Sequence, residues 1–214
     1  MKIIGSVKED LAVEKRNSIT PETIKKFVNI NFSVFLERNY GMHQGITDEE
    51  FKKEGANMLS SAKEVLEKSD IVLMFNFPSI DKIDSIKSES ILIGQFDLIL
   101  NKEIISKLLK KDIKIFSLNL LPRITRAQSM DVLSSQANLA GYRAAIESVH
   151  EFGKAVPMMM TAAGTITPAK ILVIGAGVAG LQALATAKRL GGIVSATDVR
   201  LAAKEQVESL GGKF

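Results

Sequence analysis

The stretch ILVIGAGVAGLQALATAKRLGGIVSATDVR at residues 171–200 decides the fold of the second half of the chain. It predicts an apolar strand, a GxGxxG turn, an alanine-rich helix and a second strand ending at Asp198. This order opens a dinucleotide-binding domain. There the first glycine allows a tight turn, the second lets backbone approach the pyrophosphate, and the third packs the helix on its strand. Gly175, Gly177 and Gly180 hold those places.

Two charged residues at the end of the second strand bear on the choice of nucleotide. Asp198 stands about 20 residues beyond the turn, where an acidic residue accepts hydrogen bonds from a ribose 2′-OH. A carboxylate repels a 2′-phosphate, so we expect NAD rather than NADP. Arg200 complicates this expectation, because an arginine near this place can pair with a 2′-phosphate. The alternative for the whole unit is a βαβ turn that binds no ligand.

Composition excludes several classes of function. The 214 residues are 46% hydrophobic and 24% charged, with a net charge of +4, which is ordinary for a globular protein. The absence of cysteine removes disulfides, zinc–thiolate sites and thiol nucleophiles, and we predict no metal site. Lysines cluster only at 107–114, on a predicted helix and its exit, so we expect no nucleic-acid partner. With no signal peptide and no apolar run of about 20 residues, we expect a soluble chain.

The N-terminal part alternates strands and helices. Apolar runs predict strands at 2–7, 33–37, 70–75, 90–96 and 113–118, with helical segments between them. Thr20 with Pro21 predicts a helix start, and Thr47 with Glu50 and Ser61 with Glu64 predict capping boxes. Such alternation favours a parallel sheet covered on both faces. We therefore expect a flavodoxin- or Rossmann-like α/β domain over residues 1–121.

Residues 122–153 are expected to form a loop and a long connecting helix, before a second domain over 154–214. Helix formers dominate from Ser134 onward. The loop before it is polar, and it fits either a helix start with an N-cap and an ion pair or a ligand-binding loop facing a cleft between the domains. Met158, Met159 and Met160 are interpreted as packing between the domains.

Three segments resemble a known family: PRITRAQSMDVLSSQANLAGYRA, PMMMTAAGTITPAKILVIGAGVAGLQALATAKRLGG and VSATDVRLAAKEQVESLGGKF. They are similar to the NAD(H)-binding domain of proton-translocating, Re/Si-specific NAD(P) transhydrogenase α subunits, in the alanine dehydrogenase/transhydrogenase family. The resemblance implies a domain that exchanges hydride with NADP(H) bound on a partner domain or β subunit. It also implies a homodimer, a membrane-embedded subunit that moves protons, and a peripheral position on the cytoplasmic side of the bacterial inner membrane.

The same resemblance implies the site residues. The catalytic set in the loop and helix start is Arg123, Gln128, Asp131 and Ser134. The NAD(H)-binding set is Arg123, Ile124, Thr125, Arg126, Gln128, Gly175, Ala176, Gly177, Val178, Gly180, Asp198, Val199 and Arg200. Gln128 can both donate to and accept from the nicotinamide carboxamide, which would orient the ring.

An alanine-dehydrogenase-like amino-acid oxidoreductase and a nonenzymatic NAD-binding module remain alternatives. The first needs a lysine and a histidine in its cleft besides an arginine, which Arg16 would supply. The chain offers Asn76 where the lysine is expected, and its only histidines, His43 and His150, fall in a predicted loop and in the long helix. Hydride exchange between two nicotinamides moves no proton in the chemical step, so it needs no such base.

The second domain is expected to be incomplete. After Asp198 the sequence predicts one helix at about 202–211 and the start of a third strand, whereas a dinucleotide fold has two βαβ halves. We therefore expect two Rossmann-like parallel-sheet domains joined by a long helix, the second truncated, marginally stable and inactive by itself.

Overall fold

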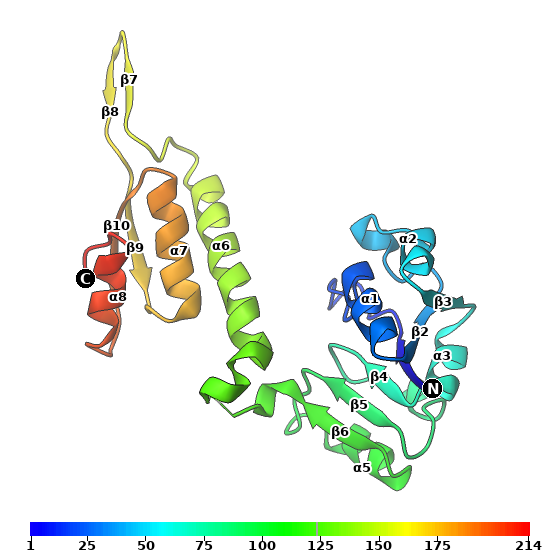
Figure 1. The fold of residues 1–214 in the computed structure, drawn as a ribbon. Coiled ribbons are helices and arrows are strands. Elements are labelled where there is room, and N and C mark those ends of the chain that lie inside the picture. The colour runs from blue at the N-terminus through cyan, green and yellow to red at the C-terminus, as the bar shows by residue number, and fades with distance from the viewer. Residues whose placement is uncertain (123) are drawn as a thin grey trace. The chain divides into compact units, whose positions relative to one another are not determined.

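The computed structural model describes residues 1–122 and 124–214, so Arg123 lies outside the described residues. These residues form two compact units, Met1–Met130 and Asp131–Phe214 (Figure 1). Within the two described ranges, no helix has both the length and the apolar character needed to cross a bilayer.

A six-stranded parallel sheet is the centre of the first unit (Figure 1). Its strands are β1 (Lys2–Ser6), β2 (Phe32–Glu37), β3 (Ala56–Leu59), β4 (Ile71–Leu73), β5 (Ile91–Gly94) and β6 (Lys114–Ser117). The order β3-β2-β1-β4-β5-β6 is that of a doubly wound α/β sheet. The predicted fold class is therefore confirmed.

The edge strand β3 corrects the sequence analysis, which predicts only helical segments between the strands at 33–37 and 70–75. Residues Ala56–Leu59 instead pair with β2, from Val34 opposite Ala56 to Glu37 opposite Leu59. Four residues are too few to display the two-residue period of a strand. The strand forms because β2 has a free edge with which these residues pair, and the local sequence does not encode that long-range pairing.

Helices connect the strands of the first unit. They are α1 (Pro21–Asn29), α2 (Asp48–Lys53), α3 (Ala62–Lys68), α4 (Ile80–Ile83) and α5 (Lys102–Lys110), with 3-10 turns η1 (Met42–Gln44), η2 (Leu118–Leu120) and η3 (Thr125–Met130). The predicted Thr47–Glu50 capping box is confirmed. The predicted box at Ser61 is only half present. Ser61 accepts from the Glu64 N–H, but the Glu64 carboxylate bonds to Ser60 instead.

Two apolar clusters lie on opposite faces of this sheet. In β2, Val34 and Leu36 belong to one cluster, while Phe35 packs against the other. Successive side chains of a strand point to opposite faces, so the clusters are on different sides. Helices α1 and α2 contribute Ile24 and Phe51 to the first cluster, and α3 and α5 contribute to the second. The sheet is therefore covered on both faces, as predicted.

The second unit contains the dinucleotide-type segment. Its elements are α6 (Val132–Phe152), β7 (Met159–Thr161), β8 (Gly164–Ile166), β9 (Lys170–Ile174), α7 (Val178–Arg189), β10 (Ile193–Thr197) and α8 (Ala203–Ser209). Strands β9 and β10 pair in parallel, and Lys213 bridges to Ser195, which begins a third parallel position beside β10. The predicted strand, helix and strand are all present.

Helices α6 and α7 pack closely because a glycine lies at their crossing. A Cβ placed on Gly141 would meet the Ala179 carbonyl oxygen at 2.0 Å. That distance is far below van der Waals contact, so only glycine allows this approach. The long helix thus packs on the helix that follows the glycine turn, and it ends at Gly153 in the left-handed conformation, with φ of 63°.

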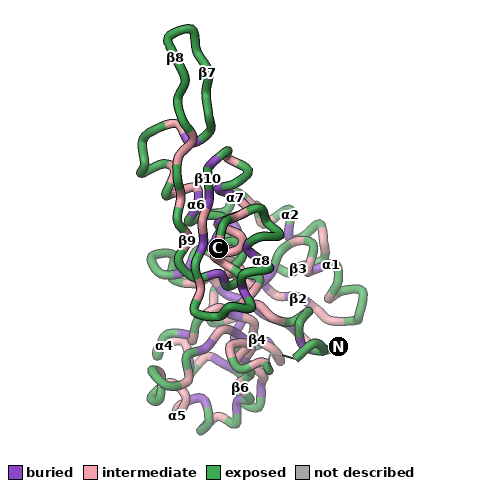
Figure 2. The backbone as a smooth tube through the Cα atoms, turned by 90° about the vertical axis from the view of Figure 1, so that its left-hand side faces the viewer, coloured by how far each residue is buried: buried purple, intermediate pink, exposed green. Residues whose placement is uncertain are grey.

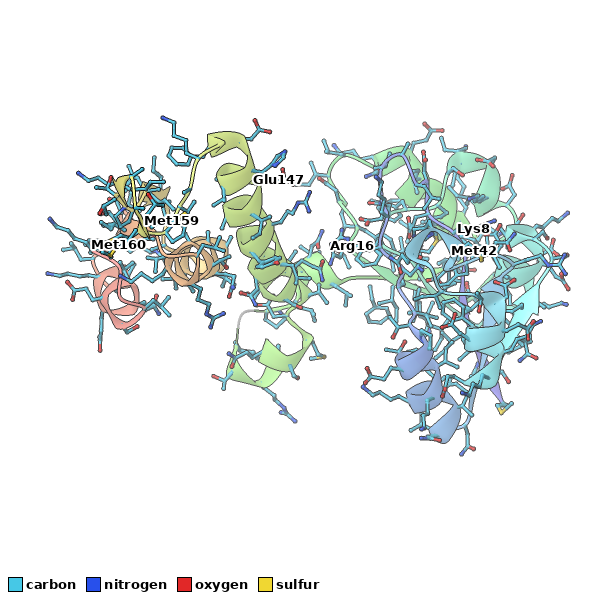
Figure 3. All side chains as sticks on the ribbon, turned by 90° about the horizontal axis from the view of Figure 1, so that it is seen from above. Lys8, Arg16, Met42, Glu147, Met159 and Met160 are labelled. Carbon is cyan, nitrogen blue, oxygen red and sulfur yellow. The ribbon has the colours of Figure 1, made fainter. Side chains whose placement is uncertain are left out.

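The hairpin β7–β8 carries Met159 and Met160 of the methionine run. Figure 2 shows it exposed along nearly all of its length. Met159 and Met160, labelled in Figure 3, have exposed fractions of 46% and 80%, and Met158 one of 60%. Met159 and Met160 lie on this antiparallel hairpin and Met158 precedes it, and packing of the three between the domains stays a prediction. The turn lies at the small residues Ala162 and Ala163, with Thr161 opposite Gly164, and each strand has only three residues, too few to show the two-residue period of a strand.

Candidate nucleotide-binding site

The glycine turn joins the end of β9 to the start of α7. Gly175 has φ of +94°, a conformation that favours glycine, and its N–H donates to the Thr197 carbonyl of β10 at 2.8 Å. A Cβ on Gly180 would lie 1.7 Å from the Gly175 carbonyl oxygen. The fold itself therefore requires the first and third glycines, one for conformation and one for close packing.

Gly177 differs from both. It has φ of −81° and ψ of −168°, which any residue can adopt, and a Cβ on it would meet no atom within 4 Å. Neither backbone strain nor packing among the described residues calls for glycine at this position. Two physical reasons remain, the modest preference for glycine at a helix N-cap and the close approach of an atom that belongs to a ligand.

The N-terminus of α7 is open beside this glycine. Gly177 is its N-cap residue and supplies no side-chain hydrogen bond to the first turn, and the Leu181 N–H is the first to bond back, to the Gly177 carbonyl at 2.9 Å. Within the described ranges, the first N–H groups of α7 thus carry no cap. Together with the helix dipole, they form a place suited to an anion such as a pyrophosphate.

Asp198 faces this turn from the end of β10. Its Oδ2 accepts from the Ala176 N–H at 2.8 Å, and its side chain is only 7% exposed. The Arg200 backbone N–H and Nε donate to Oδ1 at 2.8 and 3.0 Å, and Arg200 Nη2 donates to Oδ2 at 3.1 Å. The Arg200 guanidinium first, and then the two backbone N–H groups, hold the pKa of Asp198 well below its usual range.

Neighbouring residues of the predicted set differ in burial. Ala176 is 1% exposed and its N–H already donates to Asp198, so it holds the glycine turn against the end of β10. Val178 and Val199 are 45% and 101% exposed, so both present apolar surface beside the turn. Val199 stands between Asp198 and Arg200 and makes no contribution to the core. An exposed valine at a strand end is available for contact with a planar apolar group such as a nucleotide base.

The loop residues of the predicted set lie in and beside η3. Ile124 precedes it, Thr125, Arg126 and Gln128 lie within it, and all four are exposed. The prediction for Arg123 lies outside the described residues. Buried Ala127 fixes the turn beneath these exposed side chains.

Asp131 and Ser134 are brought into direct contact at the start of α6. Asp131 is the N-cap residue, and its carboxylate accepts from the Ser134 N–H at 3.0 Å and from the Ser134 hydroxyl at 2.6 Å. The N-cap part of the helix-start interpretation is thus confirmed. With its proton donated to Asp131, the Ser134 hydroxyl still has lone pairs that can accept a hydrogen bond from a ligand amide. A capping role and a ligand role are compatible here.

The arginine that would serve an amino-acid oxidoreductase is already engaged in the first unit. Arg16 Nε and Nη2 donate to Glu14 at 2.8 and 2.5 Å, and its guanidinium stacks 4.3 Å from the centre of the Phe75 ring. Glu14 is the main cause of the raised pKa of Arg16. The Glu14 carboxylate would compete with a substrate carboxylate for this guanidinium.

Glu9 is a residue of this region that the sequence analysis does not single out. Its carboxylate accepts from the backbone N–H groups of Phe75 and Asn76 at 2.6 and 3.4 Å, and burial raises its pKa. It therefore ties the end of β1 to the chain after β4. The two histidines lie where expected, His43 in η1 with Nε2 2.9 Å from the Lys15 carbonyl, and His150 exposed on α6.

Comparison with known proteins covers both units. Residues 5–140 match the model of the alanine dehydrogenase/PNT N-terminal domain, and residues 144–214 match that of the C-terminal domain. An NAD(P) transhydrogenase subunit alpha chain of Rhodospirillum rubrum is 49% identical over 99% of this chain and 56% of its own length. Alanine dehydrogenase of Methanococcus maripaludis is 28% identical over 92% of this chain and 53% of its own length.

A solved structure agrees with the sequence relatives. The crystal structure of transhydrogenase from Sinorhizobium meliloti superimposes with a TM-score of 0.95 and 48% identity, over 100% of this chain and 64% of that one. The chain spans 56% of the length of the Rhodospirillum rubrum relative, a little more than half.

Proposed function

We propose that this chain, which belongs to the alanine dehydrogenase/PNT family, is the NAD(H)-binding part of a transhydrogenase that exchanges hydride between NAD(H) and NADP(H). The main observation behind this proposal is Gly177. It is a glycine that the protein's own packing does not need, next to the uncapped first turn of α7. The higher identity to a transhydrogenase subunit than to an alanine dehydrogenase supports the reaction.

The adenosine half of NAD(H) would be held by the second unit. The pyrophosphate would lie against the N–H groups at Gly177 and Val178, where the helix dipole favours an anion. Asp198 would accept from the ribose hydroxyls. A carboxylate at that point disfavours the 2′-phosphate of NADP(H). These roles assign NAD(H) to this chain and NADP(H) to a partner domain.

The nicotinamide half would be oriented by the polar loop. The bound nicotinamide supplies the hydride or accepts it. Gln128 would pair with its carboxamide, and the Asp131–Ser134 pair would fix the helix start beside it, with Arg123 contributing to the same group. Hydride transfer needs the reacting carbons about 3–3.5 Å apart and aligned, so positioning is the main task of these residues.

The partners follow from the same proposal. An NADP-binding domain or β subunit would accept or donate the hydride, and a membrane-embedded subunit would couple the exchange to proton movement. The chain would lie on the cytoplasmic side of the bacterial inner membrane. The exposed β7–β8 hairpin, with Met160 80% exposed, supports a homodimer, since a second copy would cover its apolar side chains.

The alternative of amino-acid oxidation is disfavoured by the pairing of Arg16 with Glu14. It predicts reduction of NAD⁺ by L-alanine, which a single absorbance assay of the full-length protein would detect. A nonenzymatic NAD-binding module would bind NAD(H) and exchange no hydride with a partner. Both alternatives are therefore separable from transhydrogenation by activity.

Loop variants are expected to separate positioning from binding. Gln128→Ala should lower the rate of hydride exchange about 100-fold, because the ring loses its orienting partner, while NAD affinity changes less than about threefold. Asp131→Asn keeps an N-cap acceptor and should also lower exchange more than affinity. Steady-state exchange and calorimetric titration of the full-length protein measure the two quantities.

Ser129→Ala is the matched control, since Ser129 is an exposed neighbour in the same 3-10 turn. It should leave both exchange and affinity at wild-type values. Equal losses of exchange and affinity in Gln128→Ala would make the loop a binding element and contradict the positioning role.

A further inference from the structure

The Asp198 carboxylate already has its full complement of donors before any nucleotide binds. Each oxygen accepts two hydrogen bonds, and the four come from Ala176 and from three groups of Arg200. A carboxylate offers about four lone-pair positions, so a ribose hydroxyl can bond to Asp198 only if a present donor leaves. The two backbone N–H groups are fixed by the strand end and the turn. The Arg200 side chain is the donor that can leave, because it is 64% exposed.

On the basis of the proposed function, we infer that Arg200 sets how strictly the site selects NAD(H) over NADP(H), by occupying and neutralising the carboxylate that would discriminate between them. The bidentate pair of Arg200 with Asp198 carries no net charge. A 2′-phosphate approaching this pair meets a guanidinium as well as a carboxylate, and guanidinium is a good phosphate ligand. The repulsion expected from Asp198 is thereby reduced.

Arg200 also competes with the nucleotide that the site prefers. The ribose of NAD(H) must displace Nε and Nη2, at 3.0 and 3.1 Å, before its hydroxyls reach the carboxylate. Arg200 therefore weakens the binding of NAD(H) and makes the site less unfavourable for NADP(H). Both effects lower the ratio of NAD(H) affinity to NADP(H) affinity relative to an isolated aspartate.

The hydrogen bonds of Asp198 distinguish a role of Arg200 in nucleotide selectivity from a role in holding Asp198 in place. Without its side chain, residue 200 still donates its backbone N–H to Asp198, and Ala176 still donates to the other oxygen. The guanidinium also reaches the Ala176 carbonyl, but only with Nη2 at 3.5 Å. Asp198 thus keeps its position in Arg200→Ala, and the melting temperature should remain close to that of the wild type.

The test is titration of the full-length protein with NADH and NADPH, for the wild type, Arg200→Ala and Arg200→Lys. Arg200→Ala should raise the ratio of NADH affinity to NADPH affinity by about tenfold or more, because an unpaired carboxylate then faces the 2′-phosphate. The increase should shrink at high salt, since this carboxylate would be partly exposed. Arg200→Lys keeps the charge and should fall between the other two.

Arg189→Ala is the control, since it removes the same charge from the last turn of α7, at the helix end opposite the glycine turn. It should leave the ratio unchanged. An unchanged or lower ratio in Arg200→Ala, with NADH still bound, would overturn the inference and leave the proposed function intact. A wild-type protein that binds neither nucleotide would overturn the proposed function itself.

Discussion

Gly180→Ala is expected to destabilise the second unit by about 3 kcal/mol or more. Its Cβ would lie 1.7 Å from the carbonyl oxygen and 2.9 Å from the carbonyl carbon of Gly175. Both are backbone atoms of a turn that is itself tied to Thr197, so they cannot move away as a flexible side chain would. Helix α7 would have to separate from β9, which would disturb the core cluster that contains Leu184 and Val194.

Denaturant unfolding of the full-length protein, followed by circular dichroism, measures this loss. Ala179→Gly is a useful comparison, because it weakens the same helix turn by propensity alone, about 1 kcal/mol, without a steric conflict. A Gly180→Ala protein as stable as the wild type would show that the turn tolerates a side chain, and would contradict the packing account of the third glycine.

Gly177→Ala is expected to fold and to lose NAD. The backbone conformation suits alanine, and the added carbon meets no atom within 4 Å. Stability should fall by no more than about 1 kcal/mol, through the poorer N-cap. The methyl group would occupy the space that the pyrophosphate needs, so NAD affinity should fall about 100-fold, as a steric conflict of about 2.7 kcal/mol requires.

Calorimetric titration with NAD⁺ gives the affinity, and the melting temperature reports folding. Gly180→Ala and Gly177→Ala thus add the same methyl group three residues apart. The first is expected to lower stability, and the second to lower NAD affinity while the protein stays folded. Wild-type NAD affinity in a folded Gly177→Ala protein would mean that no ligand atom approaches this glycine, which would remove the main support for the proposed site.

Local signals in the sequence are sufficient for much of the fold. The strand, glycine turn, helix and strand at 171–200 are predicted correctly, because glycine spacing and apolar runs are properties of neighbouring residues. The same holds for the parallel α/β sheet and for the Thr47 cap. Strand β3 escapes prediction because its four residues depend on the free edge of β2, and strands β7 and β8 because three residues each are too few to show a strand period.

In the candidate site, too, the sequence predicts what depends on neighbouring residues and misses what depends on long-range contacts. Spacing alone singles out Gly177 and Asp198. It cannot reveal that Gly177 faces open space, or that Asp198 already accepts four hydrogen bonds, because both depend on where separate segments meet. The pairing of Arg16 with Glu14 has a similar origin. It depends on side-chain orientations that charge spacing does not specify.

Hydride exchange tests the central claim most directly. The full-length protein is mixed with the partner NADP-binding domain, NADPH and an NAD⁺ analogue whose reduced form absorbs at its own wavelength. The account predicts reduction of the analogue at a rate that requires both proteins and saturates with the analogue. An analogue that binds normally but is not reduced in the presence of the loaded partner would contradict the assignment of this chain to transhydrogenation.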